Sequence, residues 1–432
     1  MSYADFISRK RRIWTGIGHE AGRLPDGLFD WQQALTRWAL RKGRAALFCD
    51  TGLGKTRMQV AWASGLQART LIFAPLCVAE QTVAEAAVIG VPVTYARQHS
   101  EAGPGISITN YERLDRFDMS QFDAVVLDES SILKAFDGKT RTRLIETCGV
   151  VKYRLCCTAT PSPNDISELG NHAAFLGLMT FSEFLATWFV HDDNGWRMKK
   201  HAVQPFYRWM ASWAVAMRKP SDLGYDDNGY VLPPLTIIDH EIAVDGPTGD
   251  TLFPEMSTRG LKGRLSARKG SLEARTDEAV RLVNQSPTQC QWLVWCGLNA
   301  ESDRITDLVN GTKQNVQGSD DYDEKVAGIT GFMRGDIRTL VSKTDILGYG
   351  LNLQHCHHMA FCGISDSFES FYQAVRRCWR FGQQHGVSAH VIYSEAEKVV
   401  VENVRRKELA ARDLATELIG QMSEFEREEV LA

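Results

Sequence analysis

The chain has 432 residues and a mass of 48.4 kDa, with 49 Lys and Arg against 53 Asp and Glu, a formal net charge of −4. Hydrophobic residues make up 44% and charged residues 24%, which excludes an intrinsically disordered chain. No apolar run approaches the ~20 residues that span a bilayer, and residues 1–12 lack the apolar segment of a signal peptide. We therefore expect a cytoplasmic protein of two or three domains that contacts no membrane. The slightly acidic charge alone argues weakly against a nucleic-acid partner.

In chain order, a basic segment (residues 1–27) is followed by short apolar runs that alternate with helix-like stretches. Runs of this kind, bounded by Gly, Pro, Asp or Thr, are typical of buried parallel strands in a doubly wound α/β sheet; they lie at 45–49, 70–74, 124–127 and 153–157. The same rhythm recurs at 291–295, 339–342, 358–361 and 389–393. We predict an α/β fold with one lobe at 28–179 and a second at 285–395.

The region between these lobes, residues 180–284, is rich in aromatic residues and is predicted to be a mainly helical insertion ending in a basic connector. Helical spacing of Phe206, Trp209, Met210 and Trp213 favours a buried face over stacking on bases. The tract 259–269 carries five basic residues and no acidic one, so it is either a solvated linker or a contact to DNA phosphates. A helical tail is expected at 396–432.

The strongest local signal is the segment Cys49-Asp50-Thr51-Gly52-Leu53-Gly54-Lys55-Thr56, which follows a predicted strand and precedes a predicted helix. Glycines let a backbone wrap a phosphate, so that its N–H groups and the helix N-terminus meet the charge. Lys55 would reach the β- and γ-phosphates, and Thr56 would bind Mg²⁺. Cys49 occupies the position of the usual first glycine. The strand–loop–helix context favours a phosphate loop over a glycine-rich turn.

A second signal is the apolar strand that ends in Asp128 and Glu129. Such a pair suits Mg²⁺ coordination by Asp128 and activation of water by Glu129. Alone the pair is weak, because strand-ending acids commonly cap a turn, but the upstream phosphate loop favours the catalytic interpretation.

A third signal lies in the second lobe, where Arg377 and Arg380 share one helical face at i and i+3. Two guanidinium groups there could stabilise γ-phosphate charge as arginine fingers do. A solvated basic helix, or a strip that contacts nucleic-acid phosphates, remains an equal alternative on composition alone.

The order of these motifs resembles that of superfamily-two helicases, and within them the Swi/Snf-type DNA translocases. Short helicases encoded by phages or prophages are the most similar kind. The segment 348–354, Gly-Tyr-Gly-Leu-Asn-Leu-Gln, and the ending Arg-Phe-Gly-Gln at 380–383 are typical of the Swi/Snf branch. The resemblance covers roughly residues 28–395 and implies two RecA-like lobes with ATP and Mg²⁺ bound between them.

The resemblance also implies roles for individual residues. Catalytic residues would be Lys55, Asp128, Glu129, Arg377 and Arg380. ATP would contact Gln32, Asp50, Thr51, Gly52, Leu53, Gly54, Lys55, Thr56, Gly350 and Gln373. Mg²⁺ would be held by Thr56 and Asp128. Nucleic acid would lie against Pro75, Asn110, Tyr111, Thr158, Thr160, Lys343 and Asn352, with the basic tract adding Arg264 and Arg268.

Two positions depart from the family pattern. Ser130 and Ser131 stand where the family has Ala-His, and that histidine is one link between the ATP state and nucleic acid, so coupling could run through other groups. Arg376 replaces a glycine usual before the first arginine finger. Neither change removes a group needed for hydrolysis.

A cluster of histidines and cysteines (His355, Cys356, His357, His358 and Cys362) invites a zinc hypothesis. Alternate residues of a strand point to opposite faces, so the cluster cannot converge, and we favour core packing. The ten cysteines contain no CxxC pair, which favours reduced thiols over disulfides or a zinc site.

The leading functional hypothesis is an ATP-driven motor on duplex or branched DNA, acting as a monomer, with replication or recombination proteins as further partners. The alternatives are an ATP-dependent RNA helicase and an ATP-switched scaffold that recruits replication proteins.

Overall fold

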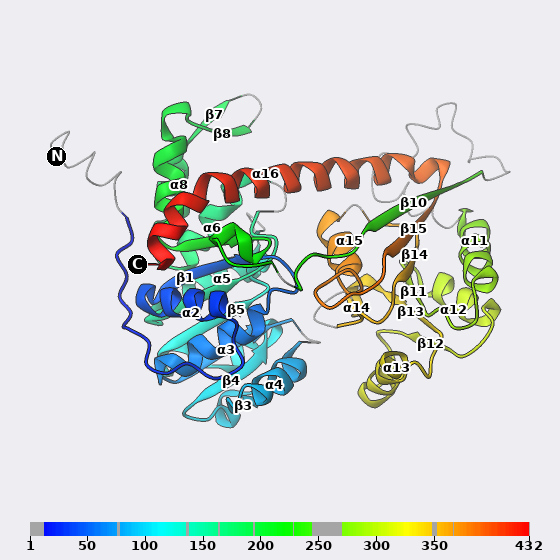
Figure 1. Cartoon of the computed structure of the whole chain (residues 1–432), viewed down its shortest axis with the longest axis horizontal. Coiled ribbons are helices and arrows are strands. Elements are labelled where there is room, and N and C mark those ends of the chain that lie inside the picture. The colour runs from blue at the N-terminus through cyan, green and yellow to red at the C-terminus, as the bar shows by residue number, and fades with distance from the viewer. Residues whose placement is uncertain are drawn as a thin grey trace. The chain divides into compact units, whose positions relative to one another are not determined.

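The computed structural model describes residues 13–75, 78–134, 138–162, 165–192, 195–227, 229–243, 270–347, 352–365 and 367–431. These residues form two compact units. The first contains the chain up to Tyr230 together with the chain from Ala410 on, and the second is Val231–Leu409. Each unit is built on a parallel sheet with helices (Figure 1), so the predicted fold of two doubly wound lobes is confirmed.

The first unit is organised around a seven-stranded sheet of order β3-β4-β2-β5-β6-β1-β9, in which every pairing is parallel. The central strands are apolar along their whole length because helices cover both faces of such a sheet. The strands are β1 (Arg44–Cys49), β2 (Thr70–Ala74), β3 (Val93–Tyr95), β4 (Ile106–Asn110), β5 (Ala124–Asp128), β6 (Tyr153–Cys157) and β9 (Ala214–Met217).

Helices connect these strands, as the alternating sequence pattern predicts. The helices of this unit are α2 (Asp30–Lys42), α3 (Lys55–Leu66), α4 (Ala79–Val88), α5 (Lys139–Thr147), α6 (Leu169–Phe175), α7 (Phe181–Trp188) and α8 (Val203–Ala211). A two-stranded antiparallel hairpin of β7 (Phe189–Asp192) and β8 (Gly195–Met198) separates α7 from α8.

The segment that follows α6 is part of the first unit and not a separate insertion, which corrects the predicted boundary at residue 180. Phe206 and Trp213 are fully buried in the same apolar cluster as Phe48 of β1. Strand β9 extends the sheet, with Ala46 of β1 opposite Ala214. The buried face predicted for Phe206, Trp209, Met210 and Trp213 is confirmed, since none of these side chains is more than 5% exposed.

The second unit has a six-stranded parallel sheet of order β10-β15-β14-β11-β13-β12. Its first strand, β10, comes from the predicted insertion, so this sheet starts before residue 285. The strands are β10 (Leu235–Ile242), β11 (Trp292–Cys296), β12 (Lys313–Val316), β13 (Thr339–Lys343), β14 (His358–Cys362) and β15 (Val387–Ser394). The basic tract 259–269 lies outside the described residues.

A buried ion network joins the helices of the second unit. Arg275 of α11 is fully buried and bonds Glu301 of α12 at 2.8 Å and Glu397 at 3.2 Å. A buried guanidinium requires such partners because an uncompensated charge in the interior is costly. The helices are α11 (Leu272–Gln285), α12 (Asn299–Leu308), α13 (Tyr322–Arg334), α14 (Thr344–Leu347), α15 (Phe368–Val375) and the first part of α16 (Lys398–Leu431).

Helix α16 forms the helical tail and contributes to both units. Its residues up to Leu409 belong to the second unit, and those from Ala410 on belong to the first. In the first unit, Leu418 and Met422 are buried in the same apolar cluster as Phe206. Among the described residues, no helix combines the length and the apolarity that crossing a membrane requires.

Candidate functional site

The loop 50–54 connects the end of β1 to the first residue of α3, as expected for a phosphate loop. Gly52 and Gly54 have φ angles of +88° and +71°, which side chains rarely tolerate. These two residues let the chain turn directly into the helix, so that backbone N–H groups at the start of α3 are available to an anion.

Lys55 is the first residue of α3, directly after the loop, and is buried. Its Nζ atom donates hydrogen bonds to the carbonyl oxygens of Cys49 at 2.9 Å and Asp50 at 3.3 Å. Thr56 follows it and is partly exposed. The carbonyl oxygens of the loop thus accept the hydrogen bonds of the ammonium group. A bound anion would replace them as its partners.

Gln32, which the family resemblance assigns to ATP contact, supports the loop from α2. Its Nε2 donates to the carbonyl oxygen of Leu53 at 3.0 Å, and its Oε1 accepts from the backbone N–H of Phe29 at 3.0 Å. A Cβ atom added at Gly54 would lie 2.4 Å from this Nε2. The amide therefore holds the loop in place, a contact that the motif comparison had not predicted.

Asp128 and Glu129 come at the carboxyl end of β5, in the same sheet. Asp128 is 5% exposed. Burial raises the pKa of its carboxyl group to about 7; the nearby charge of Glu129 also raises it, and Lys55 opposes both. Glu129 has a left-handed backbone, with φ of +56°, which is uncommon for a residue with a side chain. Strain of this kind is typical of functional positions.

Three residues assigned to nucleic-acid contacts lie around this acid pair. The Tyr111 hydroxyl donates to the carbonyl oxygen of Asp128 at 2.7 Å, and burial raises its pKa well above the usual value, so it stays protonated. Thr158 Oγ1 donates to Glu129 Oε2 at 3.3 Å and accepts from the N–H of Thr160 at 3.1 Å. Tyr111 and Thr158 are buried, so their side chains line the acid pair and present no surface to a strand in this conformation.

Asn110 is also buried, because its side chain joins neighbouring strands and loops. Its Oδ1 accepts from the Tyr95 hydroxyl at 2.8 Å, and its Nδ2 donates to the carbonyl oxygen of Pro75 at 3.3 Å. Pro75 itself is partly exposed. Of the residues assigned to nucleic acid in this unit, Pro75 is thus more accessible than Asn110.

In the second unit, Arg377 and Gln373 form a close pair. Arg377 is 4% exposed; its Nη2 donates to Gln373 Oε1 at 2.8 Å and its Nε to the Gln373 carbonyl oxygen at 3.0 Å. Arg380, one turn later, is partly exposed. Arg376, which replaces the family glycine, is buried with its guanidinium 4.9 Å from the Trp379 ring centre, so it packs within the unit.

The remaining predicted residues of this unit divide into two groups. Lys343 at the end of β13 and Asn352 are partly exposed. Gly350, Arg264 and Arg268 lie outside the described residues.

The histidine and cysteine cluster is packed into the second sheet. Cys356 and Cys362 are fully buried, and His358 stacks on Trp292 with ring centres 5.1 Å apart. Within the described part of the chain, no group of three or more His, Cys, Asp or Glu has the arrangement of a metal site. These contacts support the core-packing interpretation of the sequence.

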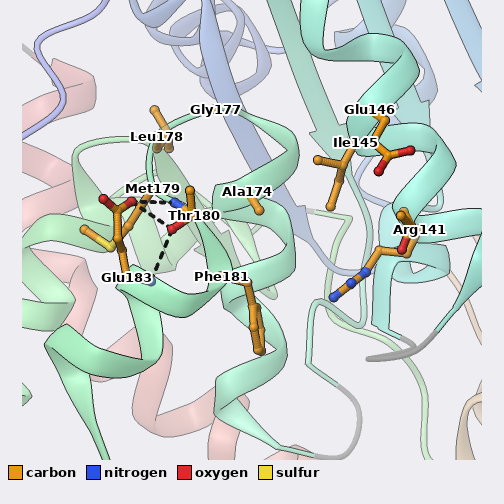
Figure 2. Close-up of a pocket in the computed structure, with 11 residues that line it drawn as sticks. Arg141, Ile145, Glu146, Ala174, Gly177, Leu178, Met179, Thr180, Phe181 and Glu183 are labelled. Atoms are coloured by element: carbon orange, nitrogen blue, oxygen red, sulfur yellow. Dashed lines mark hydrogen bonds between the residues drawn. The ribbon is translucent and has the colours of Figure 1, made fainter.

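A cavity of about 420 Å³ lies elsewhere in the first unit (Figure 2). It separates α5, which carries Arg141 and Ile145, from the turn between α6 and α7, where Thr180 and Glu183 form a capping box. None of the predicted site residues lines it. The cavity is therefore separate from the candidate site.

Two residues near the acid pair escaped the sequence analysis. Gln59 is fully buried, and its amide lowers the pKa of Asp128. Its position four residues after Lys55, on the same face of α3, was an available signal. His172 of α6 lies 3.2 Å from the Ser130 hydroxyl, 42 residues away in sequence, and no local pattern could indicate this contact.

Residues 279–382 match the family described as the helicase conserved C-terminal domain. The second unit is therefore similar, over these residues, to a helicase C-terminal domain. This match includes Gln373, Arg377 and Arg380, and it confirms in this unit the helicase resemblance seen in the motifs. No curated protein matches the chain. Among solved structures, the SWI2/SNF2 ATPase core of Sulfolobus solfataricus in complex with dsDNA is similar at 16% identity, over 92% of this chain and 98% of that chain, with a TM-score of 0.45.

Proposed function

We propose that the chain is an ATP-driven superfamily-two motor that moves along DNA, of the Swi/Snf type. The observation that carries the proposal is the meeting of a phosphate loop, Lys55, Asp128 and Glu129 at the carboxyl edge of one parallel sheet. Ligands of such sheets bind at this edge. The helicase C-terminal domain in the other unit supports a motor over a simple nucleotide-binding protein.

The residues present fit ATP and Mg²⁺. The loop offers N–H groups to phosphates, while the raised pKa of Asp128 reports a buried carboxyl group that a divalent cation would compensate. Thr56 and Asp128 would hold the ion, whose chemistry is to neutralise charge on the β- and γ-phosphates.

The proposed chemistry assigns one task to each remaining group. When ATP binds, Lys55 would release its hydrogen bonds to the carbonyl oxygens of Cys49 and Asp50 and bind phosphate oxygens instead. Glu129 accepts the proton of the attacking water, and its contact with Thr158 Oγ1 orients the carboxylate. Positioning and electrostatics supply most of the catalysis in phosphoryl transfer, so the strained Glu129 backbone is consistent with a preorganised base.

Arg377 and Arg380 are proposed charge-stabilising residues on the basis of their motif. Arg377 would release its hydrogen bond to Gln373 and bind a phosphate oxygen instead. Arginine fingers contribute on the order of 10³–10⁵ in rate. We expect Arg377→Ala to lose hydrolysis by a factor in this range while retaining ATP binding.

Duplex or branched DNA is the proposed substrate because the sequences at 348–354 and 380–383 resemble the corresponding motifs of the Swi/Snf branch. Replication, recombination or repair in a phage or prophage is the proposed context, with replication or recombination proteins as partners and a monomer as the working unit.

The decisive experiment measures ATP hydrolysis alone and with duplexes, forks, Holliday junctions, single strands and RNA, with Lys55→Ala as the inactive control. Stimulation by duplex or branched DNA supports the proposal. Absence of hydrolysis under every condition would instead indicate an ATP-switched scaffold, and strongest stimulation by RNA would indicate an RNA helicase. A strand-displacement assay on the same forks separates unwinding from translocation.

A further inference from the structure

A buried hydrogen bond links the proposed acid pair to helix α6. The Ser130 hydroxyl and His172 Nε2 lie 3.2 Å apart, and both side chains are fully buried. Ser130 directly follows Glu129. In the family this turn carries its own histidine at the next position, which is Ser131 here. The fold supplies an imidazole to the same turn from a different helix.

Glu129 needs such an anchor because its backbone is strained. A left-handed residue with a side chain costs roughly 1–2 kcal/mol, and it persists only where its surroundings hold it. Thr158 contacts the Glu129 carboxylate, and Tyr111 holds the carbonyl oxygen of Asp128. At the next residue, the Ser130 hydroxyl contacts His172 and also the Cys156 thiol.

His172 is itself fixed on two sides. Its ring meets Phe48 edge-on with centres 5.1 Å apart, and Phe48 belongs to β1, just before the phosphate loop. Helix α6 is packed tightly against α7, since a Cβ atom at Gly170 would lie only 2.5 Å from Phe184. Burial lowers the pKa of His172 to about 3, so the ring is neutral and the bond joins two neutral groups.

We propose that His172 is a positioning residue for ATP hydrolysis, which holds Glu129 in its strained conformation through Ser130. This inference rests on the proposed ATPase function. It makes α6, and with it the aromatic segment that packs on α6, a support for the proposed general base.

The alternative is that His172 only fills space beside Phe48, and variants of matched shape separate the two. His172→Phe keeps a ring against Phe48 but removes the nitrogen, Ser130→Ala removes the hydroxyl, and His172→Gln keeps a polar group within reach of Ser130. Ser131→Ala is the control at the adjacent serine.

The experiment measures kcat and KM for ATP in DNA-stimulated hydrolysis, together with thermal unfolding. We expect kcat to fall about tenfold in His172→Phe and in Ser130→Ala, with KM within about twofold of wild type. His172→Gln should recover most of the activity, and the double variant should be no slower than either single one, because both remove one contact.

Unchanged kcat in His172→Phe and Ser130→Ala, with an active wild type, would overturn the inference alone. Additive losses in the double variant, or losses that follow the unfolding temperature and are not rescued by glutamine, would also overturn it. If the wild type hydrolyses no ATP with any polymer, the proposed function fails and the inference fails with it.

Discussion

The Tyr111 hydroxyl donates a 2.7 Å hydrogen bond to the main-chain carbonyl oxygen of Asp128, and the Tyr111 ring stacks on Phe73 with centres 5.9 Å apart. Tyr111 belongs to a motif that faces nucleic acid in the resembled family. Here its side chain forms part of the wall behind the acid pair. Tyr111, which directly follows β4, thus connects the end of that strand with Asp128, the proposed metal ligand.

Tyr111→Phe tests that assignment. Removal of the hydroxyl leaves a buried carbonyl oxygen without its donor, so we expect a loss of about 1–2 kcal/mol in the free energy of unfolding and a severalfold lower kcat. DNA affinity should stay within about twofold of wild type, as judged by fluorescence anisotropy. A large loss of DNA affinity with normal hydrolysis in the absence of DNA would instead return Tyr111 to the nucleic-acid surface.

Gly54→Ala should destabilise the loop 50–54, the proposed phosphate loop, for two reasons. The φ of +71° strains any side chain, and the new Cβ would meet Gln32 Nε2 at 2.4 Å. We expect a loss of about 1–3 kcal/mol in denaturant unfolding and weaker ATP binding by calorimetry.

Two further variants control this prediction. Gly149→Ala places its Cβ where no atom lies within 4 Å and should be close to neutral. In a Gln32→Ala background the steric part of the Gly54→Ala effect should disappear. An equal loss in both backgrounds would show that the contact with Gln32 does not contribute.

The second unit should lose stability as the pH falls. Burial lowers the pKa values of His358 and His390 to about 4, below the value near 6.5 of an unfolded chain. Between these values the unfolded state binds more protons, so the stabilisation is present above pH 6.5 and is lost toward pH 4. The groups around His390 are His240, His358, Glu278 and Arg281.

Thermal unfolding between pH 7.5 and 4.5 measures this effect. We expect His390→Gln to show a shallower fall in melting temperature than wild type. His201→Gln, at an exposed position of the first unit, should follow the wild-type curve. Identical slopes for His390→Gln and wild type would contradict the prediction.

Glu426 of α16 should give the opposite dependence on pH. It is fully buried, its Oε1 accepts the N–H of Ala216 at 2.7 Å, and burial raises its pKa well above the usual value. The neutral acid is therefore favoured in the folded state, and its stabilisation is lost as the pH rises toward the folded-state pKa. Glu426→Gln keeps the acceptor and cannot ionise.

We expect Glu426→Gln to melt at a higher temperature than wild type at pH 9, with a smaller difference at pH 6. Exposed Glu428→Gln on the same helix is the control. A wild-type advantage at pH 9 would show that Glu426 is held as a carboxylate.

Much of the fold could be predicted because its signals are local. Buried parallel strands are continuous apolar runs, and a phosphate loop needs glycines between a strand and a helix, so β1, β5 and the loop 50–54 could be placed from the residues alone. The boundaries of the two units could not be predicted in this way. The sequence pattern of the aromatic segment after α6 predicts an insertion. In the structure, however, β9 pairs with β1, which lies more than 160 residues earlier, and the pairing of strands so far apart depends on tertiary packing.

The roles of side chains around the site divide in the same way. The sequence indicated which chemistry the candidate site offers, because Lys55 follows a glycine-rich loop and Asp128 and Glu129 end an apolar strand. The tertiary structure alone decided what supports them, namely Tyr111 behind Asp128, Gln32 on the loop and His172 beneath Ser130. The physical reason is that a motif consists of a few consecutive residues. A buried hydrogen bond depends instead on surfaces that meet only after the chain has folded, and such contacts leave no periodic pattern in the sequence.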